Sequence, residues 1–246
     1  MRFGSSNPVF RKLEKENVVV QEGFQQATYK GIALKSLYYL LIAVIGVGLS
    51  LYLMINSPDL FVTVLIAAFI VGFISALLSF VRPAWTKITG TIYCLAEGMV
   101  LGTISMMFEA EIPGIIISAI AGTFAVVFVV SILYMTNIVK VTGKFVKFLL
   151  IFALSMILSQ LVLFILSLFI PALSTAFGGG FGLLASGLSC ALAVLYLFFD
   201  MEVIRNTVET GQPKFLEWFA AFGIVYTTLW VYIEVLRIVA IFARER

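Results

Sequence analysis

Three carboxylates lie inside or at the edge of long apolar stretches of this 246-residue chain: Glu97, Asp200 and Glu234. An ionised carboxylate is costly in a hydrocarbon environment, so an acid in such a stretch by default marks a functional site or a buried partner. The other acids fall in polar tails or connections. We therefore expect these three residues to carry any ion or proton chemistry of the chain.

The pair Asp200 and Glu234 could act as an ion path and pH sensor. Two carboxyls in hydrogen-bond contact cannot both ionise cheaply, so they would share one proton. Carboxylate oxygens also suit Ca²⁺, although water or backbone carbonyls would have to complete its six to eight oxygen ligands. The chain has no histidine, which leaves carboxyls as its pH-sensing groups.

Each acid also has a structural interpretation. Glu234 and Arg237 are spaced i,i+3, so they can form a self-neutralised ion pair on one helix face. Asp200 can be an interfacial charge with Arg205 as its local partner, or it can face inward while its neighbours face the headgroups. Glu97 can be hydrogen-bonded within a packing helix or belong to the ion path.

The two candidate acids meet only under one arrangement of the chain end. A simple hairpin with its turn at 211–213 places Asp200 about 16 Å and Glu234 about 32 Å from the turn, at 1.5 Å per residue. The mismatch disappears if residues 214–222, a mixture of aromatic and charged residues, lie in the membrane interface and the spanning helix begins near Gly223. We therefore expect 214–222 to be interfacial.

The composition predicts an all-α polytopic membrane protein, because 62% of the residues are hydrophobic and 12% are charged. Residues 1–30 form a polar tail without the features of a cleaved signal peptide, and 31–246 form a single transmembrane domain. Apolar runs near or above the roughly 20 residues that span a bilayer predict seven helices, at about 31–54, 60–81, 84–107, 114–135, 146–170, 178–200 and 215–242.

Small residues next to Glu97 predict a close helix contact. Gly98 and Gly102 are spaced four positions apart, a pattern that lets a neighbouring helix approach closely. This pattern occurs in many membrane helices, so it indicates packing and does not indicate a particular function.

The basic residues predict the orientation of the chain. Of its 16 Lys and Arg residues, thirteen lie in the tail and in alternate connections, and the opposite connections hold none. The positive-inside rule then places the amino terminus in the cytoplasm and, after seven spans, the carboxyl terminus outside. Arg244 and Arg246 fit that placement poorly, so a re-entrant last segment with both termini inside stays open as an alternative.

Several functional classes find no support in the chain. Without histidine there is no Ser-His-Asp or Cys-His arrangement, so we expect no enzyme and no resident cofactor. Cys94 and Cys190 lie in apolar runs without metal-ligand spacing. The net charge of +3 is not massed into a nucleic-acid patch.

A set of short motifs in order resembles the Bax-inhibitor (transmembrane Bax inhibitor motif) family, in its bacterial branch. The resemblance covers nearly the whole chain and is closest at its end. The motifs are Ser5-Ser6-Asn7-Pro8-Val9, Thr28-Tyr29-Lys30-Gly31, Glu97-Gly98, Phe199-Asp200, Gly211-Gln212-Pro213-Lys214, Glu217-Trp218-Phe219-Ala220-Ala221-Phe222-Gly223 and Trp230-Val231-Tyr232-Ile233-Glu234.

The resemblance implies a seven-helix bundle with the last helix central, a pH-sensitive calcium leak, and a gating pair of aspartates on the sixth and seventh helices. Asp200 matches the sixth-helix acid. Glu234 matches the seventh-helix acid by its context, although here it is a glutamate, and its spacing from Asp200 is longer than in better-studied members of the family. Arg82 is the candidate for the family's gating arginine by position. The bacterial branch implies the plasma (inner) membrane.

We therefore expect a passive Ca²⁺ pathway regulated by protons, with Asp200 and Glu234 as its transient ion site. A second hypothesis is a non-conducting regulator that binds other membrane proteins through its small-residue helix faces. The expected partners are membrane lipid, Ca²⁺ and membrane proteins, and no nucleic acid.

Overall fold

The computed structural model describes residues 25–169 and 180–244, and these residues form seven long helices. A short 3₁₀ helix, Pro83–Trp85, leads into the third of them. The long helices are α2 (Tyr29–Asn56), α3 (Pro58–Val81), α4 (Thr86–Glu111), α5 (Ile115–Met135), α6 (Gly143–Phe169), α8 (Gly180–Glu209) and α9 (Leu216–Arg244). Each is long and apolar enough to cross a bilayer, which confirms the predicted all-α membrane protein.

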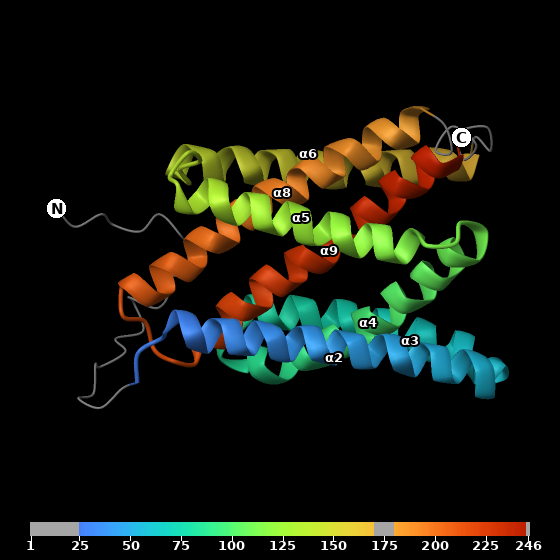
Figure 1. Ribbon diagram of the computed structural model, residues 1–246, viewed down its shortest axis with the longest axis horizontal. Helices are drawn as coiled ribbons and strands as arrows, with labels where there is room; N and C mark the ends of the chain where they lie inside the picture. The colour runs from blue at the N-terminus through green and yellow to red at the C-terminus, as the bar shows by residue number, and fades with distance from the viewer. Residues whose placement is uncertain (1–24, 170–179, 245–246) are drawn as a thin grey trace.

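The last helix occupies the centre of the bundle. In Figure 1, α2, α3 and α4 form one group, α5, α6 and α8 form another, and α9 runs between them. Buried residues of α9 take part in three apolar clusters, with Phe222 in the first, Val231 in the second and Leu236 in the third. The central position of the last helix, which the family resemblance implied, is confirmed.

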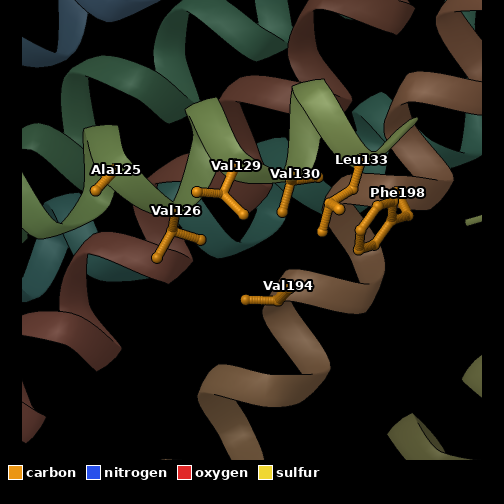
Figure 2. Close-up of a pocket in the computed structure, with 7 residues that line it drawn as sticks. All are labelled: Ala125, Val126, Val129, Val130, Leu133, Val194 and Phe198. Atoms are coloured by element: carbon orange, nitrogen blue, oxygen red, sulfur yellow. The ribbon is translucent and has the colours of Figure 1, made fainter. Parts of the chain in front are cut away.

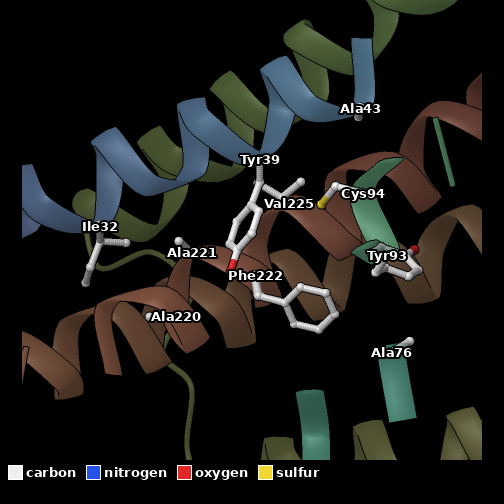
Figure 3. Packing of buried hydrophobic residues seen from close by; sticks show 10 residues of the cluster. All are labelled: Ile32, Tyr39, Ala43, Ala76, Tyr93, Cys94, Ala220, Ala221, Phe222 and Val225. Atoms are coloured by element: carbon white, nitrogen blue, oxygen red, sulfur yellow. The ribbon is translucent and has the colours of Figure 1, made fainter. Parts of the chain in front are cut away.

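Aromatic side chains join α9 to the first group of helices (Figure 3). The Phe222 ring lies 5.4 Å from Tyr93 and 6.3 Å from Tyr39, both in edge-on geometry. Tyr39 is fully buried, and its hydroxyl donates a 2.7 Å hydrogen bond to the backbone carbonyl of Thr86. Each ring therefore contributes apolar contact area, and the one polar atom of Tyr39 is satisfied.

Helices α2 and α4 approach each other through glycines. A Cβ on Gly98 would overlap the carbonyl oxygen of Ala43, and a Cβ on Gly102 would lie 3.0 Å from the Cα of Val47. Because only hydrogen atoms fit in these spaces, the predicted close contact at Gly98 and Gly102 is confirmed, and α2 is the partner.

The connection between α8 and α9 is tied to the chain just before α2. Gly211 takes a positive φ of 64°, which lets the chain turn tightly after α8. The backbone N–H of Ala27 donates to the Gln212 carbonyl at 2.8 Å, and the Lys214 N–H donates to the Gln25 carbonyl at 2.9 Å. The end of the predicted polar tail is therefore docked on this turn, which the sequence did not indicate.

The helix α9 crosses the whole bundle. It is unbroken from Leu216 to Arg244. Its last residues and the start of α2 lie at opposite ends of the bundle (Figure 1). Arg244 forms an ion pair with Glu111 at the end of α4, so its charge is matched there. The structure thus contradicts the alternative of a re-entrant last segment, and the chain is an integral multi-pass membrane protein.

Candidate functional site

Asp200 is a buried acid at the contact between α8 and α9. Its exposed fraction is 7%, and the Thr227 side chain of α9 lies beside its carboxyl group. The second carboxyl oxygen, Oδ2, has no hydrogen-bond partner among the described residues. Its other oxygen would lie 3.1 Å from a Cβ on Gly223, so a glycine at that position makes room for the acid.

The local helix explains why Asp200 faces inward. Helix α8 continues to Glu209, past the end of the apolar run at residue 200, as the inward-facing interpretation of Asp200 requires. On its outer face, Arg205 donates to Glu202 at 2.8 Å, and Asn206 donates to the same carboxylate at 3.1 Å. Arg205 is therefore paired with Glu202 and not with Asp200, as the inward-facing interpretation predicts.

Glu234 is buried but fully paired. Its Oε1 accepts hydrogen bonds from the Ser189 hydroxyl at 2.7 Å and from the Trp230 indole N–H at 3.3 Å. Its Oε2 accepts from Arg237 at 3.3 Å. The geometry of Glu234 therefore agrees with its structural interpretation as the partner of Arg237 in an ion pair.

The structure does not bring Asp200 and Glu234 together. Asp200 lies opposite Gly223 and Thr227, whereas Glu234 lies opposite Ser189. Gly223 and Thr227 precede Glu234 by eleven and seven positions on one helix, so Asp200 lies about 10–16 Å from Glu234 along the helix axis. Two carboxyls at that separation can share neither a proton nor a Ca²⁺ ion.

The prediction that residues 214–222 lie in the interface, with the spanning helix beginning near Gly223, is wrong. Helix α9 begins at Leu216, and its first turns bury Leu216, Glu217 and Ala220 in the bundle. An interfacial placement would expose that apolar surface. The chain end therefore forms the simple hairpin.

Glu217 is a third buried acid, and it was not predicted. It is fully buried, forms an ion pair with Lys35, and accepts hydrogen bonds from the backbone N–H and hydroxyl of Thr28. These contacts hold the start of α2 against the start of α9. The neighbouring aromatic residues had indicated an interfacial segment, and the partners are about 180 positions away in sequence.

Glu97 is a half-buried acid on α4 without a basic partner among the described residues. Its helix meets α9 through the Tyr93 and Tyr226 rings, whose centres lie 5.4 Å apart. Helix α8 meets α9 through the Tyr196 and Trp230 rings, whose centres lie 5.9 Å apart.

Arg82 is an exposed residue directly after α3. Its guanidinium stacks 5.0 Å from the Trp85 ring centre, and it forms no ion pair with Asp200 among the described residues. Its role as the gating arginine stays a prediction. Within the described ranges, no three acids, cysteines or histidines gather as a metal site.

Comparison with known families places these features in context. A family model described as Bax inhibitor 1 like matches residues 7–244, nearly the whole chain. A comparison with curated proteins gave no match. The matched range includes all seven described helices and the acids Glu97, Asp200 and Glu234, so the family resemblance of the sequence motifs is confirmed. The chain belongs to the Bax inhibitor 1 like family.

Proposed function

We propose that this protein is a pH-sensitive leak for Ca²⁺ in which Asp200 alone, instead of a carboxyl pair, is the proton-dependent gate. The calcium leak follows from the family resemblance. The assignment of the gate to one acid follows from the distance between Asp200 and Glu234 along the bundle.

The observation that carries the proposal is the unpaired oxygen of Asp200. Two other acids buried in the described bundle, Glu217 and Glu234, each pair with a base. Asp200 has no such base, and its Oδ2 has no hydrogen-bond partner in the described part of the chain. A buried charge without a partner is costly, so the proton on Asp200 decides how stably α8 and α9 pack.

The direction of gating follows from this cost. With its proton, Asp200 is neutral and the contact with Gly223 and Thr227 can persist. When pH rises and the proton leaves, the bare carboxylate favours any state that brings water or a cation to it. Flux should therefore increase with pH.

The proposal is tested with purified protein as the sole protein in liposomes. Ca²⁺ entry should rise between about pH 6 and about pH 8, relative to empty liposomes. Absence of flux at both pH values would favour the non-conducting regulator instead. For that alternative, the Gly98 and Gly102 face is not available as a docking face, since α2 already covers it.

A further inference from the structure

An apolar groove lies between α5 and α8 (Figure 2). Its volume is about 310 Å³, at the lower limit of typical small-molecule sites. Val126, Val129 and Leu133 line it from α5, and Val194 and Phe198 line it from α8. Both helices are long and apolar enough to span a membrane, so a lipid acyl chain is a chemically suitable occupant of the groove.

Helix α6 leaves this groove open. No described side chain of α6 lines it. Only 6% of the most apolar stretch of α6 is buried in the bundle, the smallest share of the seven spans. The groove is thus an apolar space that the described chain does not fill itself.

One end of the groove lies next to the connection between α5 and α6, and this connection leads into three lysines. The Leu133 carbonyl accepts hydrogen bonds from the N–H groups of Ile138 and Val139, so the chain folds back at that end. Lys140 follows directly, and Lys144 and Lys147 lie in the first turns of α6. We call these three residues the lysine cluster.

The lysine cluster has no matching charge. Lys140, Lys144 and Lys147 are all exposed, and none of them forms an ion pair with an acid of the described residues. By contrast, Arg205, which is near the same end through its contact with the Tyr134 ring, is paired with Glu202. Positive charge next to an open apolar groove is complementary to an amphiphile with an anionic head.

We infer that the groove and the lysine cluster together bind one anionic phospholipid from the surrounding bilayer. One acyl chain lies along Val126, Val129 and Val194, and the phosphate-bearing headgroup contacts Lys140 and Lys144. The apolar space alone would accept any lipid chain, and the lysines alone would attract any anion. The groove and the lysine cluster adjoin near Leu133, so together they favour a molecule that has both an acyl chain and an anionic headgroup.

The test is lipid retention by the detergent-purified protein, measured by native mass spectrometry. The protein is offered equal amounts of phosphatidylglycerol and phosphatidylcholine with identical acyl chains. We expect one phosphatidylglycerol per protein to be retained in preference. Equal retention of the two lipids would overturn the inference.

Two variants separate the parts of the site. Replacing the lysine cluster by glutamine should lower the preference for phosphatidylglycerol by roughly tenfold or more. Val129→Trp fills the groove and should abolish retention. The matched controls are Lys30→Gln, at another exposed lysine, and Val62→Trp, at an exposed valine of α3, and both should behave as the parent protein.

A preference that survives Val129→Trp would overturn the inference, because headgroup attraction alone would then explain it. A preference unchanged by the lysine substitutions would also overturn it. The lysine variant alters exposed side chains only, so it decides the question even where the tryptophan variant does not fold.

Discussion

Asp200 on α8 lies directly opposite Gly223 on α9, where a Cβ would come within 3.1 Å of its Oδ1. The acid is thus accommodated by the absence of a side chain and not by a basic partner. This arrangement buries a titratable group at the contact of two helices, and one of its oxygens has no hydrogen-bond partner in the described part of the chain. The stability of the contact therefore depends on both the residue at 223 and the proton on Asp200.

Gly223→Ala should be about 1 kcal/mol less stable than Gly187→Ala, because both gain helix propensity but only the methyl group at 223 crowds the Asp200 carboxyl. The measurement is thermal unfolding in detergent. Gly187→Ala on α8 is the control, since a Cβ there meets nothing within 4 Å and alanine favours a helix. Equal unfolding temperatures for the two variants would contradict the close contact.

Gly98→Ala should cost more, about 2–3 kcal/mol, because the new Cβ overlaps the backbone carbonyl of Ala43 and the backbone cannot rotate away. The same unfolding measurement applies. Gly48→Ala on α2 serves as its control, because open space surrounds that position. A stability of Gly98→Ala within error of the control would show that α2 and α4 do not pack in this way.

Lys35→Met should destabilise the protein by about 3–5 kcal/mol, since it leaves the buried Glu217 without its charge partner. Adding Glu217→Gln should recover part of that loss, which a double-mutant cycle measures. Arg205→Gln removes a partly exposed ion pair and should cost within about 1 kcal/mol. Additive effects at residues 35 and 217 would mean that the two side chains do not interact.

The predicted cytoplasmic placement of the amino terminus is tested by labelling of introduced cysteines. In a variant without Cys94 and Cys190, a cysteine at Ser57 should react with a membrane-impermeant reagent from outside, and one at Thr142 only from inside. Thr142 precedes α6 and Ser57 separates α2 from α3, so the two lie at opposite ends of the bundle. Labelling of Thr142 from outside would reverse the orientation.

The parts of the fold that depend on local pattern were predictable. Span positions follow from apolar run length, and the close contact at Gly98 follows from small-residue spacing. The burial of Glu217 could not be predicted, because its partners Thr28 and Lys35 belong to a distant segment. The composition of 214–222 is equally compatible with an interface or a helix start, and only the packed core decides between them. Because the sequence analysis chose the interface, it placed Asp200 level with Glu234, whereas the structure places Asp200 opposite Gly223.

The pH dependence of Ca²⁺ flux in Asp200→Asn tests the proposed gate most directly. Asparagine keeps the size and can still form hydrogen bonds, but it carries no ionisable proton. Proteoliposomes are compared at about pH 6 and about pH 8, with Glu202→Gln as a control at a surface acid of the same helix. The single-acid gate predicts that Asp200→Asn abolishes the pH response, while Glu234→Gln and Glu202→Gln retain it. A pH response that persists in Asp200→Asn, or one that is lost equally in Glu234→Gln, would contradict it.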